Sequence, residues 1–335
     1  MSETVNIAEF AKILSDEIFT IFGWQTVGPA DHTWDCVEIE KHHKKKAKVH
    51  PSDVVFKYRD PYRGIDIYLN TDLKSYAKST LQSTDLASTL RSLAGAVECA
   101  NKSPSWQTAY LTERTNYDVV GLLFLFNHDG EFDKDFPAIL GEIGPGQIKV
   151  ERQRKVFVMG PDRITYLNTI AKDILQERGA KRLPDTDYCH FYYPDMEFAK
   201  VTASKQGAAT VETLLGPWQI LRFGRNGSPQ SCPGYYFYSA STGNSEEEFM
   251  YIIDFIFTYQ LLGDEDVICI RMPLASESAT PHFERAKARY ADEFRGLTDD
   301  SKKEFQARMS RITLRTITDT KPVFSKTEIG MKRHG

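Results

Sequence analysis

Two short alternating segments joined by a tight turn constrain this chain more than any other feature. The side chains of Val54, Phe56 and Tyr58 alternate with those of Asp53, Val55 and Lys57, and residues 65–74 alternate between a largely apolar and a largely polar face. A two-residue period is that of a β-strand. The connecting residues 60–64 (DPYRG) contain a proline, which presets φ early in a turn, and a final glycine, which accepts positive φ. The sequence therefore predicts an antiparallel β-hairpin.

The turn also predicts which residues of the two strands face each other. A four-residue loop after Asp60 pairs that residue with Ile65. In this register the large apolar residues share one face, as the two-residue period demands, and Asp53 faces Asp72 with Cβ atoms about 5 Å apart. Lys74 lies on the same polar face as Asp72. Two carboxylates that close should hold a shared proton or a cation, and Mg²⁺ is the hard cation that oxygen ligands suit.

The segments Pro51-Ser52-Asp53 and Asp72-Leu73-Lys74 resemble the motif of the PD-(D/E)xK phosphodiesterase superfamily, which includes restriction endonucleases. The resemblance implies a mixed α/β fold, with a restriction-endonuclease-like αβββαβ core in residues 1–182. A change in composition at residues 181–186 (KRLPDT) predicts a boundary there. Residues 183–335 are expected to form a second, α+β domain. Further strands are predicted at residues 119–126, 156–159, 188–193, 218–223, 235–238 and 267–272.

The resemblance also implies a role for each motif residue. Asp53 corresponds to the first metal-binding acid and Asp72 to the second, with the Leu73 carbonyl as a further oxygen ligand. Lys74 corresponds to the residue that orients the attacking water and stabilises charge on the phosphate. The sequence departs from the strictest pattern in two places, because Ser52 separates the proline from Asp53 and because Asp72 stands where glutamate is commoner.

Two other segments contain the same short acid-x-lysine pattern, so context has to select among them. Residues 300–302 and 319–321 match it equally well, but neither follows a strand that pairs with a second acid-bearing strand. The alternative reading of the hairpin is a solvent-facing ribbon whose charges form ordinary surface pairs, each worth about 0–1 kcal/mol.

The first predicted helix offers a further acid. Apolar residues recur at three- and four-residue spacings from Asn6 to Phe22, which is the pattern of an amphipathic helix. In the resembled fold the first helix often lends an acid to the metal site. Glu17, at the edge of the apolar stripe, is the leading candidate and Glu9 the second, although Glu17 could simply border the core.

A basic run precedes the hairpin and is a candidate surface for the nucleic-acid backbone. Its alternative reading is a solvated loop tip. Four histidines cluster nearby, and a histidine metal site is conceivable, but their spacing fits no compact zinc pattern. The lysines of the candidate surface are Lys44, Lys45, Lys46 and Lys48, and the histidines are His32, His42, His43 and His50.

Composition sets the compartment and excludes several protein classes. The net charge of −4 excludes a globally basic nucleic-acid binder, so any phosphate binding must be local. The five cysteines are scattered, odd in number and lack C-x-x-C spacing, which indicates reduced thiols in a cytoplasm rather than disulfides or structural zinc. The polar start is no secretory signal. The apolar run at residues 249–262 is short and contains Asp254, so it predicts a buried helix and no membrane span.

Together these patterns predict a Mg²⁺- or Mn²⁺-dependent nuclease that hydrolyses DNA, although RNA stays open as a substrate. Chains with such a nuclease domain and an unassigned second half are frequent in prokaryotic restriction and anti-phage defence. The expected partners are DNA and a second protein subunit of a defence system. The sequence is also compatible with a homo-oligomer. Two alternatives stay open: a non-catalytic nucleic-acid-binding or scaffold subunit that keeps a degenerate nuclease fold, and a hydrolase of another class.

Overall fold

The chain forms two compact units in a computed structural model. The first unit reaches Asn168 and the second spans Thr169–Thr320, so the division falls within helix α6 (Pro161–Gly179). The predicted boundary between residues 182 and 183 stays a prediction. The second half of α6 is part of the second unit. The described residues are 3–42, 48–77, 81–112, 116–144, 146–148, 154–194, 207–225, 232–293, 299–318, 320 and 322.

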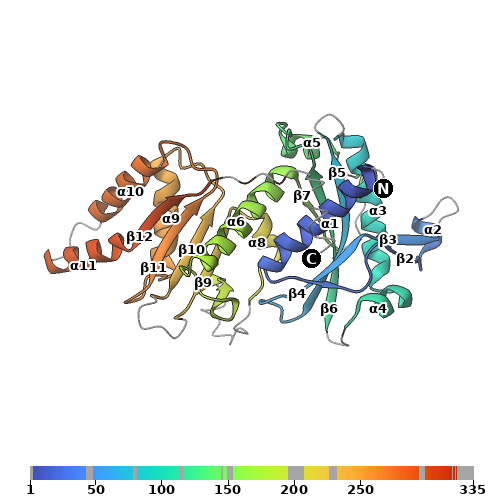
Figure 1. Cartoon of the computed structure of the whole chain (residues 1–335), viewed down its shortest axis with the longest axis horizontal. Helices are drawn as coiled ribbons and strands as arrows, with labels where there is room; N and C mark the ends of the chain where they lie inside the picture. The colour runs from blue at the N-terminus through green and yellow to red at the C-terminus, as the bar shows by residue number, and fades with distance from the viewer. Residues whose placement is uncertain are drawn as a thin grey trace. The chain divides into compact units, whose positions relative to one another are not determined.

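A five-stranded sheet with the order β1-β4-β5-β6-β7 organises the first unit (Figure 1). β1, β4 and β5 are antiparallel neighbours, whereas β5, β6 and β7 run parallel. A separate two-stranded sheet, β2-β3, is inserted between β1 and β4. The elements are α1 (Glu3–Ile21), β1 (Gln25–Val27), β2 (His32–Asp35), α2 (Ile39–His42), β3 (Val49–Ser52), β4 (Val54–Arg59), β5 (Asp66–Tyr76), α3 (Ser83–Ala100), α4 (Pro104–Tyr110), β6 (Tyr117–Asn127), α5 (Phe136–Gly141) and β7 (Val156–Met159).

Without the β2-β3 insertion and the short helix α4, the chain order up to β6 is α1, β1, β4, β5, α3 and β6. This is the predicted αβββαβ core, and the predicted mixed α/β fold class is confirmed. The strand expected at residues 119–126 is β6, which is buried along most of its length between β5 and β7. Helix α3 makes the crossover between the parallel strands β5 and β6, as a parallel connection requires.

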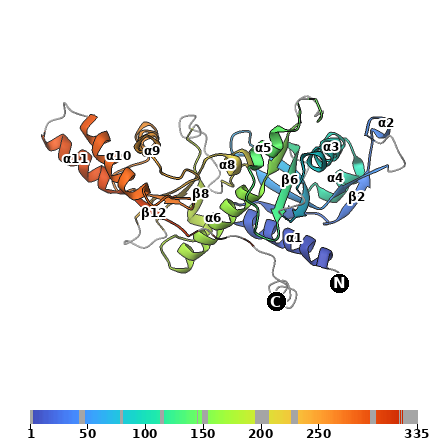
Figure 2. The same cartoon turned by 90° about the horizontal axis from the view of Figure 1, so that it is seen from above.

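Helices cover both faces of this sheet. Figure 2 shows α1 on one side of β6 and α3 and α4 on the other. On the α1 side, the ring of Phe19 packs against those of Trp24, Phe56 and Phe124, with centroids 4.3–5.8 Å apart. The large apolar residues of the hairpin therefore lie where the two-residue period placed them.

The predicted polar face of β5 is buried along the first half of that strand. Tyr68 and Asn70 are 0% and 1% exposed, because α3, α4 and the β2-β3 sheet cover them. Asn70 Oδ1 accepts hydrogen bonds from the Ser52 hydroxyl and, at 3.4 Å, from the Trp106 indole. The hairpin is thus the centre of the sheet, and a solvent-facing ribbon of surface charges does not describe it. Only from Asp72 onward do the side chains of β5 reach solvent.

The second unit holds another five-stranded sheet, β12-β11-β10-β9-β8, which is parallel from β10 to β12 and antiparallel from β8 to β10. Its strands match the predicted ones within a few residues. Helix α9 begins at a capping box, where the Ser245 hydroxyl accepts from the N–H of Glu248. The elements are η1 (Thr186–Tyr188), β8 (Cys189–Phe191), α8 (Val211–Leu215), β9 (Trp218–Phe223), β10 (Gly234–Ser239), α9 (Glu246–Thr258), β11 (Val267–Met272), α10 (Ala279–Glu293), α11 (Asp299–Ser310) and β12 (Ile312–Thr316).

An ionic cluster is buried between this sheet and the second half of α6. The guanidinium of Arg271 on β11 is 1% exposed and donates to both carboxylate oxygens of Asp173, at 2.6 and 2.7 Å. It also pairs with Glu177 at 3.2 Å. The hydroxyls of Tyr236 and Tyr238 donate to Glu177 and Asp173. Both tyrosines lie on β10 and are buried, so they are part of the core of the second unit.

No helix among the described residues is long and apolar enough to cross a membrane. The apolar run at residues 249–262 forms α9 and the turn after it. Phe249, Ile252, Ile253 and Ile256 of this helix lie in the core of the second unit.

Candidate nuclease site

The hairpin register is the one that the turn predicts. Val54 pairs with Thr71, and the five pairs that follow keep the same offset toward the turn. At the turn, the Asp60 N–H donates to the Ile65 carbonyl at 2.8 Å, and Gly64 has a φ of 60°. The local chemistry of the loop therefore sets the position of every residue on β4 and β5.

The regular ladder extends from the turn to Val54 and ends there, so Asp53 is the first residue outside it. Both Asp53 and Val54 lie against Thr71, because the Asp53 N–H donates to the Thr71 carbonyl at 3.3 Å while Val54 pairs with the same residue. Two residues opposite one constitute a β-bulge, a feature that re-aims a side chain. The carboxylate of Asp53 turns toward β5, where Oδ2 accepts the Leu73 N–H at 2.7 Å. Asp53 is thus held between Asp72 and Lys74 in the chain direction of β5.

Asp72 and Lys74 form an ion pair on the partly exposed, C-terminal half of β5. Lys74 Nζ contacts Asp72 Oδ1, with side chains 38% and 19% exposed. Burial raises the pKa of Asp53, and the nearby charge of Asp72 raises it further. Burial opposes the charged form of Lys74, but Asp72 and then Asp53 raise the pKa of its ammonium above the usual value. The three groups therefore share one electrostatic environment, as the sequence predicted.

The Leu73 carbonyl belongs to the same environment. In a β-strand the N–H and C=O of one residue point to the same side, which is how paired residues exchange two hydrogen bonds. Because the Leu73 N–H points at Asp53, its carbonyl also faces the β4 side, beyond the first residue of β4. Two carboxylates and a carbonyl are hard oxygen donors, so the residues fit a divalent cation of the Mg²⁺ or Mn²⁺ type.

Glu17, the candidate for a fourth acid, is exposed on α1. α1 packs on the face of the sheet that carries Phe124, which pairs with Leu73, whereas Asp72 and Lys74 point to the opposite face. The role of Glu17, or of Glu9, in the site stays a prediction.

Asp31 is the acid near the site that sequence reasoning missed. Its N–H donates to the Asp53 carbonyl at 2.9 Å, and its charge contributes to the raised pKa of Asp53. Asp31 has a φ of 51°, and its carboxylate pairs with Lys12 at 3.1 Å. The sequence signal for Asp31 was weak. This residue follows Gly28-Pro29-Ala30, which indicates a turn, and aspartate tolerates positive φ better than most residues.

The predicted basic surface falls largely outside the part of the chain that the structure describes. Lys44, Lys45 and Lys46 lie there, whereas Lys48 is exposed just before β3. Lys41, at the start of the run, forms an ion pair with Glu98 at 2.6 Å. Contact of these lysines with nucleic acid stays a prediction.

Of the two competing acid-x-lysine segments, residues 300–302 lie on helix α11, so they lack the paired strands that the site needs. Asp319 and Lys321 of the other segment lie outside the described residues.

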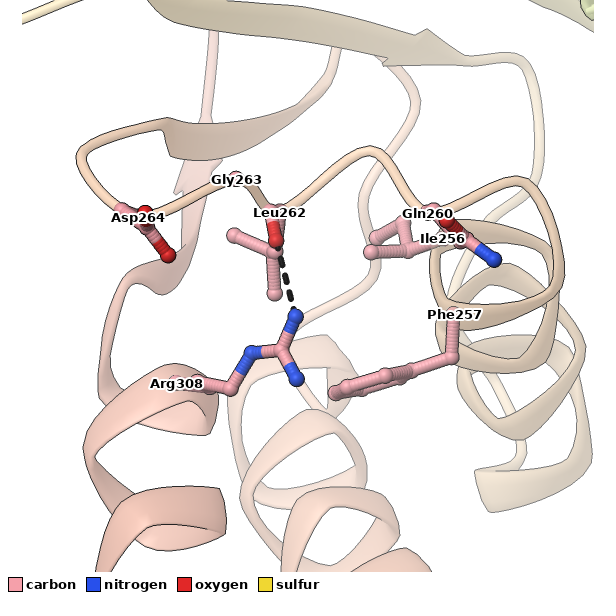
Figure 3. A pocket seen from close by; sticks show the side chains of 7 residues that line it. All are labelled: Ile256, Phe257, Gln260, Leu262, Gly263, Asp264 and Arg308. Atoms are coloured by element: carbon pink, nitrogen blue, oxygen red, sulfur yellow. Dashed lines mark hydrogen bonds between the residues drawn. The ribbon is translucent and has the colours of Figure 1, made fainter.

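A pocket of about 460 Å³ in the second unit is a weaker candidate site (Figure 3). Its charged lining residues are Asp264 and Arg308, and the Arg308 guanidinium donates to the Leu262 carbonyl at 3.0 Å. The remaining lining is apolar or amide, so the pocket brings together no paired acids.

Comparison with known protein families identifies the domain that carries the hairpin. The family model described as the GAPS4 protein PD-(D/E)XK nuclease domain matches residues 1–163. Residues 1–163 form a PD-(D/E)XK nuclease domain. The nuclease domain contains both sheets of the first unit and ends in the first turn of α6. A comparison with curated proteins found no match. The resemblance seen in the hairpin motif is thereby confirmed, and it supports a nuclease-type function for the chain.

Proposed function

We propose that this protein is a divalent-metal-dependent deoxyribonuclease whose catalytic residues are Asp53, Asp72 and Lys74. The observation that carries the proposal is the convergence of these three side chains at the open half of the central strand of a nuclease domain. Asp53, Asp72 and the Leu73 carbonyl would hold Mg²⁺ or Mn²⁺. Such a cation supplies positive charge that neutralises both carboxylates, acidifies water and polarises a phosphate.

The chain's own groups have separate tasks in this proposal. The Lys74 ammonium keeps its proton, because the two carboxylates raise its pKa, so it can orient a water molecule and stabilise negative charge developing on the phosphate. Burial raises the pKa of Asp53, so this carboxylate favours a proton or a cation beside it. The hydrogen bond from Leu73 and the bulge fix the direction of Asp53 before substrate arrives.

The test uses the purified full-length protein with supercoiled plasmid and linear DNA, in Mg²⁺, Mn²⁺ or EDTA. Asp72→Asn and Lys74→Ala should each lower the cleavage rate by about 100-fold or more, which is the range for one preorganised catalytic group. Asp118→Asn is the matched control, because Asp118 is also an ion-paired aspartate, 21% exposed, at the far end of the same sheet. It should cut at the wild-type rate.

Two outcomes would decide against this assignment. An Asp72→Asn protein that cuts DNA as fast as wild type would show that Asp72 is not catalytic. A wild-type protein that neither cuts DNA or RNA nor binds Mg²⁺ in calorimetry would favour the non-catalytic binding or scaffold subunit.

We further propose that the nuclease acts in prokaryotic restriction or anti-phage defence, with the second unit as sensor, dimerisation unit or docking surface for another subunit. The support is the combination of a nuclease domain with a second unit that the matched family model does not reach. Phage plating efficiency on bacteria that express wild-type or Asp72→Asn protein measures this. Equal plating on both strains would contradict a defence role for the nuclease.

A further inference from the structure

Four potential metal ligands from four separate segments meet beside the β2-β3 sheet. Cys36 follows β2, His42 ends α2, His50 lies on β3 and Cys99 lies near the end of α3. One donor atom from each residue lies within 4.8 Å of all the others. The cysteines are 63 residues apart in sequence, so no local motif announces the cluster.

The distances among the donor atoms of Cys36, Cys99 and His42 are close to the edges of a tetrahedral zinc site. Bond lengths of about 2.3 Å to sulfur and 2.0–2.1 Å to nitrogen give edges of about 3.8 Å between two sulfurs and about 3.6 Å between sulfur and nitrogen. The sulfurs of Cys36 and Cys99 are 3.6 Å apart. His42 Nδ1 lies 3.6 Å from the Cys36 sulfur and 3.2 Å from the Cys99 sulfur.

Groups next to the four residues hold the ligand side chains in place, as hydrogen-bond partners usually do around metal ligands. The second nitrogen of His42, Nε2, lies 2.8 Å from a carboxylate oxygen of Glu98, which is 4% exposed. A carboxylate there accepts a hydrogen bond from the Nε2–H group, which leaves the Nδ1 lone pair directed toward the sulfurs. Backbone N–H groups of Val37 and Glu38 donate to the Cys99 sulfur.

Both imidazole rings pack on helix α3. Gly95 lies one turn before Cys99, so the two residues share a face of the helix. The rings of His42 and His50 lie over Gly95, where an added Cβ atom would be in ordinary van der Waals contact with both, at 3.5–3.7 Å. The rings themselves are 5.4 Å apart between centroids.

We propose that Cys36, His42, His50 and Cys99 bind one zinc ion in a closed, structural site. Four protein ligands complete a tetrahedron and leave no position for water, which is the arrangement of structural rather than catalytic zinc. Two thiolates and two imidazoles are softer donors than the oxygens at Asp53 and Asp72, so the two sites select different metals. The zinc ties the β2-β3 sheet to α3.

A disulfide bond and a site of hard donors both fit the cluster less well than zinc does. A disulfide needs sulfurs about 2.05 Å apart, whereas those of Cys36 and Cys99 are 3.6 Å apart. A second set of donors, Glu38, His42 and Glu98, also lies close together. Its two carboxylates already pair with Lys102 and Lys41, and a set of hard donors lacks the sulfurs that favour zinc.

The first experiment measures metal in intact, tag-free wild-type protein purified without chelator. Elemental analysis should find about one zinc ion per chain. After exchange into Co²⁺, the protein should show the visible bands of tetrahedral cobalt and a near-ultraviolet thiolate-to-cobalt band. Zinc-free protein that also gives no such cobalt spectrum overturns the proposal, as does a Cys36–Cys99 disulfide found by mass spectrometry of the unreduced protein.

Variants then identify the ligands. Cys36→Ser should lose the zinc and the thiolate-to-cobalt band, whereas Cys189→Ser, a change at a buried cysteine of the second unit, should keep both. Glu98→Gln should keep the ligands but weaken zinc affinity about 10–100-fold in competition with a chelator, the range for loss of a carboxylate behind a ligating histidine. Full zinc content and unchanged affinity in both Cys36→Ser and Glu98→Gln would place the metal elsewhere and overturn the assignment. None of these readouts depends on nuclease activity.

Discussion

Replacing Arg271 by methionine tests whether the second unit depends on its buried charges. The guanidinium of Arg271 and the carboxylate of Asp173 are 1% and 4% exposed, and they share two hydrogen bonds. Methionine keeps much of the side-chain volume but removes the charge. Asp173 would then keep the Tyr238 hydroxyl as a donor but would have lost the cation that compensates its charge.

The expected loss follows from this geometry. Removing one partner of a buried ion pair costs about 3–5 kcal/mol, because the other charge stays buried without compensation. The loss of the Arg271 contact with Glu177 adds less to this cost. The hydrogen bond from Arg182 and then the charge of Arg271 hold the pKa of Glu177 at about 2, and Arg182 would remain in the variant. For a unit of this size the melting temperature should fall by roughly 6–20 °C. The control Arg285→Met removes an arginine that is 53% exposed from its pair with Glu246, and should cost at most about 1 kcal/mol.

The assay must read the second unit separately, because two units can unfold in separate transitions. Hydrogen exchange of the β10 and β11 amides, followed by mass spectrometry, does this. A loss no larger than that of Arg285→Met would refute the reasoning.

Two further changes test the nuclease domain. Asp53→Asn should abolish cleavage yet stabilise the fold at neutral pH, because burial raises the pKa of Asp53 and so disfavours its charged form. Since the raised pKa lowers stability only where the carboxylate is charged, the gain should vanish below the ordinary pKa of 3.8 and grow above it; a melting temperature below wild type at neutral pH would contradict this. Gly121→Ala should cost about 1–3 kcal/mol in urea unfolding, because its Cβ would lie 3.0 Å from both Leu93 and Val97. Gly141→Ala, with nothing within 4 Å, should be neutral or stabilising, and equal effects of the two glycine changes would refute the packing argument.

The sequence predicted the hairpin well because its information is local. A proline and a glycine set the loop, the loop set the register, and the two-residue period set the faces, so the pairing of Val54 with Thr71 needed no knowledge of the rest of the fold. The reasoning failed one residue beyond the regular ladder. The bulge at Asp53 replaces a direct pairing with Asp72 by a hydrogen bond to Leu73, and nothing in the alternation of side chains encodes that extra residue.

Features that depend on distant segments could not be read in the same way. Asn70 looked like a solvent-facing residue, because the helices that cover it come later in the chain. The scattered cysteines argued against structural zinc, since the usual signal is a short spacing between ligands. Cys36 and Cys99 meet only because α3 crosses behind the β2-β3 sheet. Arg271 and Asp173 are likewise 98 residues apart, and their pairing follows from the packing of α6 on the second sheet.

Strand β3 connects the two metal sites that we propose. A two-stranded sheet by itself is marginally stable in water, so β2-β3 needs an anchor outside its own ladder. His50 on β3 would supply that anchor through zinc bound to Cys99, and the Ser52 hydroxyl, which accepts from the Trp34 indole at 2.9 Å, fixes the end of the same strand. Asp53 is the next residue. Because a metal-binding carboxylate must be held within a fraction of an ångström, an anchor three residues before it restricts the backbone from which Asp53 projects. The proposed zinc site would thus fix the position of Asp53 without taking part in the cleavage itself.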